Sequence, residues 1–245
     1  MPIQRKQPDR IYAEPRASIE RFVFDEAVTQ VFADMINRSV PGYQTVLGML
    51  SVFAQRHSRA DRPIYDLGCS LGASTLMLRR GANPGSRVIA IDNAPAMVEQ
   101  CRRHIAIDDE KIPVEVQLAD IEDVAFQPAS LVVLNFTLQF IAPEHRSALL
   151  RRLNDTLSTG DALVIAEKIH FDEPTTQSLM TDLHHGFKRA NGYSELEISQ
   201  KRAALEAVLQ TDTVDTHVAR LRTCGFRTIE VWFQCLNFVG LIAIK

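Results

Sequence analysis

The amino-acid sequence predicts an α/β fold: a Rossmann-like, doubly wound and mostly parallel sheet that ends in an antiparallel hairpin. Between residues 63 and 167, short apolar segments of strand composition alternate with segments of helical composition. Such alternation is typical of a parallel sheet with helices on both faces. Toward the C-terminus, two β-rich runs follow each other with no room for a helix between them.

Two helices are expected before the sheet. Apolar residues recur near helical spacing from 24 to 38, and Pro41-Gly42-Tyr43 separates this helix from a second one at 45–55. The alternating region then predicts strand 63–67, helix 73–80, strand 87–92, helix 95–104, strand 114–119, strand 130–136, helix 143–157 and strand 161–167. We find no internal repeat and no low-complexity tract.

The pattern changes after Lys168. Residues 172–212 are expected to form helices interrupted at Asn191-Gly192, and a helix at 216–224 should end at Gly225, a favourable C-cap. The runs 227–234 and 238–245 are joined only through Leu236-Asn237. They must pair antiparallel, because a parallel return needs a crossover of about a dozen residues or more. A parallel sheet with this ending resembles the class I S-adenosylmethionine (SAM) dependent methyltransferases more than nicotinamide enzymes.

Length and composition favour one α/β domain spanning residues 1–245, which the resemblance implies to be SAM-binding. We divide it into an N-terminal arm (1–23), N-terminal helices (24–60), the sheet region and a helical insertion (172–215). Residues 1–16 are polar, charged and proline-punctuated, so we expect them to be disordered. The 46% of apolar residues in 245 supply a sizeable core, and the formal net charge of −3 gives no basic excess for binding nucleic acid directly.

The chain shows no signal for a metal, a disulfide or a membrane. Its four cysteines form no C-x-x-C pair, and the adjacent His184 and His185 would face different sides of a helix. The N-terminal segment has no apolar h-region, and the apolar run near 131–140 is too short to span a bilayer. We therefore expect a cytoplasmic protein with reduced thiols and no metal.

A glycine turn follows the first strand. Asp66 ends that strand, and Gly68 to Gly72 lead into the helix at 73, where glycines allow close backbone approach and the helix start offers unpaired N–H groups. About twenty residues later, Asp92 ends the second strand, where ribose hydroxyls are held in such sheets. Either signal alone has an ordinary explanation, as a plain strand-to-helix connection or as a loop or cap acid.

The order of polar residues along the chain favours a nucleoside-cofactor site. Asp120 and Asn135 end the third and fourth strands, so four polar positions fall at the carboxyl ends of strands, where ligands bind in doubly wound sheets.

Longer motifs resemble the carboxy-S-adenosyl-L-methionine (carboxy-SAM) synthase family. They are VPGY at 40–43, YDLGCSLG at 65–72, AIDN at 90–93, VLNFTLQF at 133–140 and FKRANGYSELEISQKR at 187–202. The likeness covers nearly everything from Phe24 onward. The last block lies outside the generic cofactor core and is the most specific.

The resemblance implies that SAM and prephenate are converted to carboxy-SAM, with release of phenylpyruvate and water. It also implies a homodimer, and a separate tRNA carboxymethyltransferase that uses the product to modify a wobble uridine (cmo5U). Carried over by motif, the residues that would contact the carboxylated cofactor are Tyr43, Gly68, Cys69, Ser70, Asp92, Asn93, Asp120, Ile121, Asn135 and Arg202.

The residue types suit these roles. A carboxylate at Asp92 can accept from both ribose hydroxyls, Asp120 can accept from the adenine amine, and Ile121 can pack on the ring. Without the resemblance, Ile121 would be assigned to core packing, and Asn135 to a strand-end hydrogen bond just as readily.

Arg202 and Tyr43 are the candidate catalytic residues. A planar guanidinium at Arg202 matches the new carboxylate bidentately, and the Tyr43 hydroxyl can donate to the same group. By pattern alone, Lys201-Arg202 and Lys188-Arg189 would belong to a solvated helix face, and we keep the second pair as structural or secondary substrate candidates.

Two other functions remain open from sequence. The generic core alone would favour an ordinary methyltransferase acting on tRNA or a small molecule, and a non-catalytic SAM-binding partner is the third possibility. The net acidity weakens the tRNA version, and the block containing Arg202 favours the synthase. In that reaction prephenate would supply CO2 and the base, so the protein would mainly hold the reactants together and exclude water.

Overall fold

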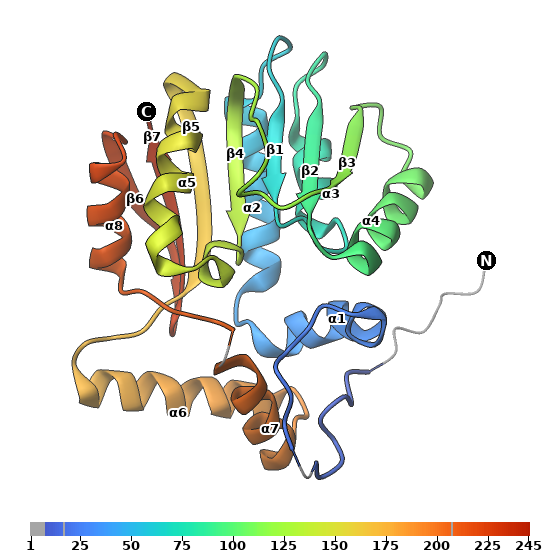
Figure 1. Cartoon of the computed structure of the whole chain (residues 1–245), viewed down its shortest axis with the longest axis vertical. Helices are drawn as coiled ribbons and strands as arrows, with labels where there is room; N and C mark the ends of the chain where they lie inside the picture. Colours follow the sequence, from blue (N-terminus) through green and yellow to red (C-terminus); the bar gives the residue numbers. More distant parts are fainter. Residues whose placement is uncertain (1–7, 17, 207) are drawn as a thin grey trace.

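The computed structural model describes residues 8–16, 18–206 and 208–245. Within these residues, one seven-stranded sheet has the order β3-β2-β1-β4-β5-β7-β6 (Figure 1). Its strands are β1 (Ile64–Leu67), β2 (Val88–Asp92), β3 (Val114–Leu118), β4 (Ala129–Asn135), β5 (Leu157–Lys168), β6 (Thr228–Cys235) and β7 (Phe238–Ile244). The first five strands pair in parallel, whereas β7 is antiparallel to both β5 and β6. The predicted fold class and the terminal hairpin are confirmed.

Helices cover both faces of the sheet. One face packs on α5 (Pro143–Thr156) and α8 (Val214–Thr223) through a core that includes Leu67, Leu134 and Leu153. The other packs on α2 (Tyr43–His57) and α3 (Ala73–Gly81), with Ile64 and Val133 in its core, while α4 (Pro95–Ile107) packs beside β3. Successive strand residues alternate between the two cores, as the pleat requires.

Three more helices lie beyond the carboxyl ends of the parallel strands. They are α1 (Glu26–Ser39), α6 (Pro174–Ala190) and α7 (Glu195–Glu206), in the lower half of Figure 1. The predicted interruption at Asn191-Gly192 is present, but residues 208–212, which were expected to be helical, are not. Thr213 instead caps α8 by accepting from Thr216 N, and Asp212 forms a bridge with Ile169. β5 is also longer than predicted, because it begins directly where α5 ends. The single-domain division stays a prediction.

The N-terminal arm is packed where the structure describes it, so the expectation of disorder is wrong for residues 8–16; residues 1–7 lie outside the described residues. Asp9 is 2% exposed and accepts from Lys201 Nζ at 3.3 Å and from the Tyr193 hydroxyl at 2.5 Å. Gln200 of α7 donates to the carbonyls of Tyr12 and Glu14. Polar composition suggested disorder, but these polar groups are satisfied by partners distant in sequence.

We expect Asp9→Ala to lower the free energy of unfolding by about 3–5 kcal/mol, because it leaves the buried Lys201 ammonium without its carboxylate. Urea unfolding measures the change. Glu14→Ala is the matched control in the same arm, since this side chain is exposed, and it should change the value by no more than about 0.5 kcal/mol. A loss below about 1 kcal/mol for Asp9→Ala would mean that this ion pair does not hold the arm.

Candidate active site

A cavity of about 1430 Å³ lies between the carboxyl ends of the strands and the helices beyond them. The turn after β1, the ends of β2, β3 and β4, and the helices α1, α2, α6 and α7 all contribute to it. The structure therefore brings together on one cavity every residue carried over by motif: Tyr43, Gly68, Cys69, Ser70, Asp92, Asn93, Asp120, Ile121, Asn135 and Arg202.

The glycine turn is fixed by its neighbours. Gly68 has φ +79°, and a Cβ there would lie 2.3 Å from Thr137 Oγ1, so only glycine fits. The Thr137 hydroxyl donates to the Leu67 carbonyl at 2.8 Å, and the Gly68 amide donates to Ile91 O at 2.8 Å. Backbone from three strand ends thus sets the shape of this part of the cavity.

Asp92 links the turn to the second strand. Its Oδ2 accepts from Ser70 N at 2.8 Å, and its Oδ1 accepts from Ala94 N at 2.9 Å. Burial raises the pKa of this carboxyl, although both backbone bonds act in the opposite direction. Each oxygen keeps a further lone pair, so Asp92 can hold the turn and still accept from a ligand diol.

The third strand ends in a second polar cluster. Asp120 Oδ1 accepts from Glu122 N at 2.9 Å, and its Oδ2 accepts from Asn93 Nδ2 at 3.1 Å. Ile121 belongs to the hydrophobic core on the α5 face and also lines the cavity. Its two interpretations from sequence, core packing and ring contact, are therefore compatible.

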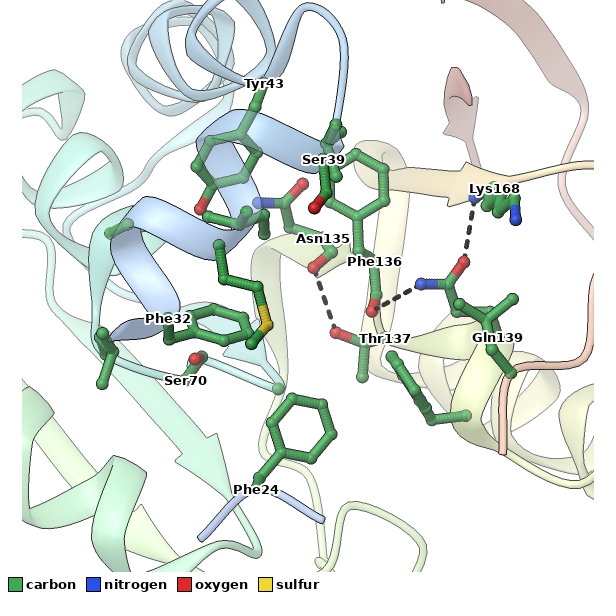
Figure 2. Close-up of a pocket in the computed structure, with 18 of the residues that line it drawn as sticks. Phe24, Phe32, Ser39, Tyr43, Ser70, Asn135, Phe136, Thr137, Gln139 and Lys168 are labelled. Atoms are coloured by element: carbon green, nitrogen blue, oxygen red, sulfur yellow. Dashed lines mark hydrogen bonds between the residues drawn. The ribbon is translucent and has the colours of Figure 1, made fainter. Parts of the chain in front are cut away.

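Asn135 and Tyr43 lie together beside Phe136, as Figure 2 shows. Asn135 Nδ2 donates to Ser74 Oγ at 2.8 Å, whereas its buried Oδ1 has no partner among the described residues. An unsatisfied buried acceptor facing a cavity suits a ligand donor such as the α-ammonium of SAM. Burial raises the pKa of Tyr43, so its hydroxyl remains a donor at neutral pH.

Glu167 supports the segment after β4, and sequence reasoning missed it. This fully buried carboxyl accepts from the amides of Leu138 and Gln139 at 2.8 and 3.0 Å, and burial raises its pKa to about 8. Gln139 in turn accepts from Lys168 N at 3.0 Å (Figure 2). An acid within an apolar strand gives no sequence signal of which amides it will bind.

The opposite side of the cavity is aromatic. Phe24 packs edge to face on Phe140 and Phe32, with ring centroids 5.5 and 6.0 Å apart, and Figure 2 shows Phe24 and Phe32 bordering the pocket near Ser70. Phe32 lies on α1 and Phe24 in the segment before it. They make this part of the cavity apolar.

The cationic end of the cavity differs from the solvated helix face expected by pattern alone. Arg202 is exposed and lines the cavity, but Lys201 and Lys188 are buried at 3% and 7% exposure. His184 lies one turn before Lys188, and its Nε2 donates to the Ser39 carbonyl at the end of α1, at 2.8 Å. The i, i+4 spacing of His184 and Lys188 is the signal that places both on one side of α6.

No group of three or more His, Cys, Asp or Glu side chains among the described residues is placed to hold a metal ion. Likewise, none of the helices in the ranges described above is long and apolar enough to cross a membrane.

The sheet order and the site at its carboxyl edge define a class I SAM-dependent methyltransferase fold. The family described as "Methyltransferase domain" matches residues 64–160. Human N-acetylserotonin methyltransferase in complex with SAM is similar, with a TM-score of 0.60 and 20% identity over 90% of this chain and 55% of that chain. The YcgJ protein from Bacillus subtilis has a TM-score of 0.60 and 12% identity over 83% of this chain and 99% of its own. The TM-scores show a shared fold.

Two relatives show the family. The carboxy-S-adenosyl-L-methionine synthase of Klebsiella pneumoniae (strain 342) is 53% identical over 238 residues, covering 97% of this chain and 96% of that protein. The protein of the same name from Pseudomonas putida (strain W619) is 53% identical over 244 residues, covering 98% and 99%. The chain belongs to the carboxy-S-adenosyl-L-methionine synthase family, which confirms the resemblance identified from its motifs.

Proposed function

We propose that this protein is an enzyme that converts SAM and prephenate to carboxy-SAM, with release of phenylpyruvate and water. The observation that carries the proposal is a single cavity in which a SAM-type turn and strand ends meet a cationic helical face. The family membership supports the same reaction. SAM is a substrate here, and no step calls for a metal.

Residues of this chain would bind SAM and orient it and the transferred carboxylate. We assign the ribose hydroxyls to Asp92, the adenine to Asp120, Asn93 and Ile121, and the methionyl end to Gly68, Cys69, Ser70 and Asn135. Arg202 and Tyr43 would hold the carboxylate that is transferred, through a bidentate pair and a hydroxyl donor. These roles are proposals supported by the shared cavity.

The proposed reaction balances without an external oxidant or base. Prephenate loses CO2 and hydroxide as its ring becomes aromatic, hydroxide removes a proton from the SAM methyl to give water, and the sulfonium ylide forms a C–C bond to CO2. Positioning supplies much of the rate, since held reactants have high effective molarity. The aromatic rings around Phe24 and Phe32 would protect the ylide and CO2 from water.

The proposal extends to the use of the product, the oligomeric state and the location of the enzyme. Carboxy-SAM would pass to a separate tRNA carboxymethyltransferase for wobble uridine modification, so this chain needs no direct nucleic-acid contact. We also propose a homodimer, on the motif resemblance, and a cytoplasmic location, on the sequence features given above.

The source of the carboxyl group is directly testable. We expect ¹³C in the ring carboxylate of prephenate to appear in the methylene carboxylate of carboxy-SAM, with no dilution by excess unlabelled bicarbonate, because CO2 is captured before it equilibrates with solvent. Mass spectrometry of the product measures the label. Extensive washout would show that free CO2 is the substrate and that the enclosed mechanism is wrong.

An ordinary methyltransferase remains the second candidate, favoured by the generic domain match over 64–160. Methyl transfer by this chain to tRNA or a small molecule without prephenate would support it. Mass spectrometry identifies a copurifying ligand, and carboxylated SAM would support the synthase. Carboxylated SAM that forms only after prephenate is added requires turnover and would exclude a non-catalytic SAM-binding role.

A further inference from the structure

Lys188 is a buried amine on the cavity, and no counterion for it lies among the residues that the structure describes. Its side chain is 7% exposed and lines the cavity from α6. Within residues 8–16, 18–206 and 208–245, no hydrogen bond or ion pair joins its ammonium to another group. The next residue, Arg189, is exposed and pairs with Glu195 at 2.9 Å. Two adjacent basic residues therefore have opposite environments.

The charges around Lys188 are all of its own sign. Burial, followed by the neighbouring Lys201, Lys168 and Arg202, lowers the pKa of Lys188 to about 7. His184 on the same helix is also buried, which lowers its pKa to about 3 and leaves it neutral, and His185 has a lowered pKa as well. Lys201 is matched by Asp9, but in the described part of the chain no carboxylate pairs with Lys188.

A buried lysine surrounded by like charges lowers the stability of the protein and indicates a ligand. A buried ammonium among cations is unfavourable unless an anion joins it, and residues of this kind concentrate at functional sites. The cavity of about 1430 Å³ also exceeds the roughly 300–1000 Å³ usual for one small ligand. Space and charge both point to a second, anionic ligand beside SAM.

We propose that Lys188 binds the carboxylate of the second substrate that is not transferred, the one on its 2-oxo acid side chain. This inference rests on the proposed function, in which Arg202 holds the carboxylate that reaches SAM. A dicarboxylate with two separate carboxylates needs two cationic positions, and α6 and α7 supply one each. After reaction, the side-chain carboxylate stays on phenylpyruvate, so Lys188 is also the product-binding residue.

Phenylpyruvate is therefore the probe, because it carries only the carboxylate in question. We expect Lys188→Met to weaken its binding and to raise the KM for prephenate about 30-fold, as expected for the loss of one charge-assisted hydrogen bond. The affinity for SAM should stay within about twofold of the parent. Arg189→Met is the matched control on the same helix and should leave all three values unchanged.

Proton uptake gives an independent readout. At pH 8 most Lys188 in the free protein is neutral, and a bound carboxylate raises its pKa, so phenylpyruvate binding should take up a large fraction of one proton. Calorimetry in two buffers of different ionisation enthalpy measures this uptake. Lys201, whose pKa burial lowers to about 8, also titrates near this pH, so the uptake must be lost specifically in Lys188→Met.

The thermal midpoint of the Lys188 variants distinguishes a loss of ligand binding from a loss of packing. Methionine fills similar space without charge, so Lys188→Met should keep or raise the thermal midpoint while binding is lost; Lys188→Gln repeats the test with a neutral polar side chain. Parent-like phenylpyruvate affinity and prephenate KM in folded Lys188→Met or Lys188→Gln would overturn the inference. If the parent protein makes no carboxy-SAM from prephenate, the proposed function fails, whatever the Lys188 variants show.

Discussion

Asp92→Ala is expected to abolish tight SAM binding. The variant removes two charge-assisted hydrogen bonds to the ribose, each contributing roughly 1.5–3 kcal/mol, so the dissociation constant should rise by about 100-fold or more. It also removes the acceptors for the Ser70 and Ala94 amides, which shape the turn against which SAM would bind. Isothermal titration calorimetry measures the affinity, and circular dichroism checks the fold.

Two further variants test whether the Asp92 carboxylate is the cause of the lost SAM affinity. Asp92→Asn retains an oxygen acceptor and should recover part of the affinity. Asp123→Ala is the matched control, since this exposed acid lies near the third strand end and contributes only its backbone amide to the Asp120 carbonyl. A folded Asp92→Ala protein with parent-like SAM affinity would rule out the ribose assignment.

Arg202→Lys is expected to retain SAM but to reduce carboxy-SAM production about 10- to 100-fold. A lysine ammonium carries the charge but has no planar fork for bidentate binding of the carboxylate. Because Arg202 is exposed, stability should not change. Product quantification by mass spectrometry with prephenate and SAM is the measurement. Arg189→Lys is the control, and a parent rate for Arg202→Lys would remove Arg202 from the reaction.

A mixed-subunit experiment extends this test to the proposed homodimer. Neither Arg202→Ala nor Asp92→Ala should be active alone. Activity recovered on mixing the two would show that one site uses residues of both subunits, whereas no recovery in a verified mixed dimer would place both residues in one subunit's site.

The sequence allowed the sheet and the cofactor half of the site to be predicted, because both depend on local order. Regular alternation of apolar and amphipathic segments indicates a parallel sheet, and residues at strand ends such as Asp92 and Asn135 must then share an edge. The hairpin followed from a link too short for a crossover.

The cationic half could not be predicted in the same way. The burial of Lys201 depends on Asp9, far away in the chain and in a segment whose composition suggested disorder. Lys188 and Arg189 are adjacent basic residues that the sequence cannot distinguish, whereas the packing of α6 against α1 and α7 buries the first and leaves the second exposed. Glu167 of β5 likewise depends on the amides of Leu138 and Gln139, which lie in the segment after the neighbouring strand β4.

The position of β7 has a consequence for the order in which the protein folds. This strand lies between β5 and β6 and pairs with both. Until it is in place, β5 presents an open edge of N–H and C=O groups next to the central hydrophobic strands, and such edges promote association between chains. Pairing β5 with β7 also closes a long loop that contains α6, α7 and α8, which is a slow step by topology. The interior strand β7 follows α6 and α7 in the sequence. The helices that carry Lys188 and Arg202 therefore reach their final positions over a sheet that is completed by a later part of the chain.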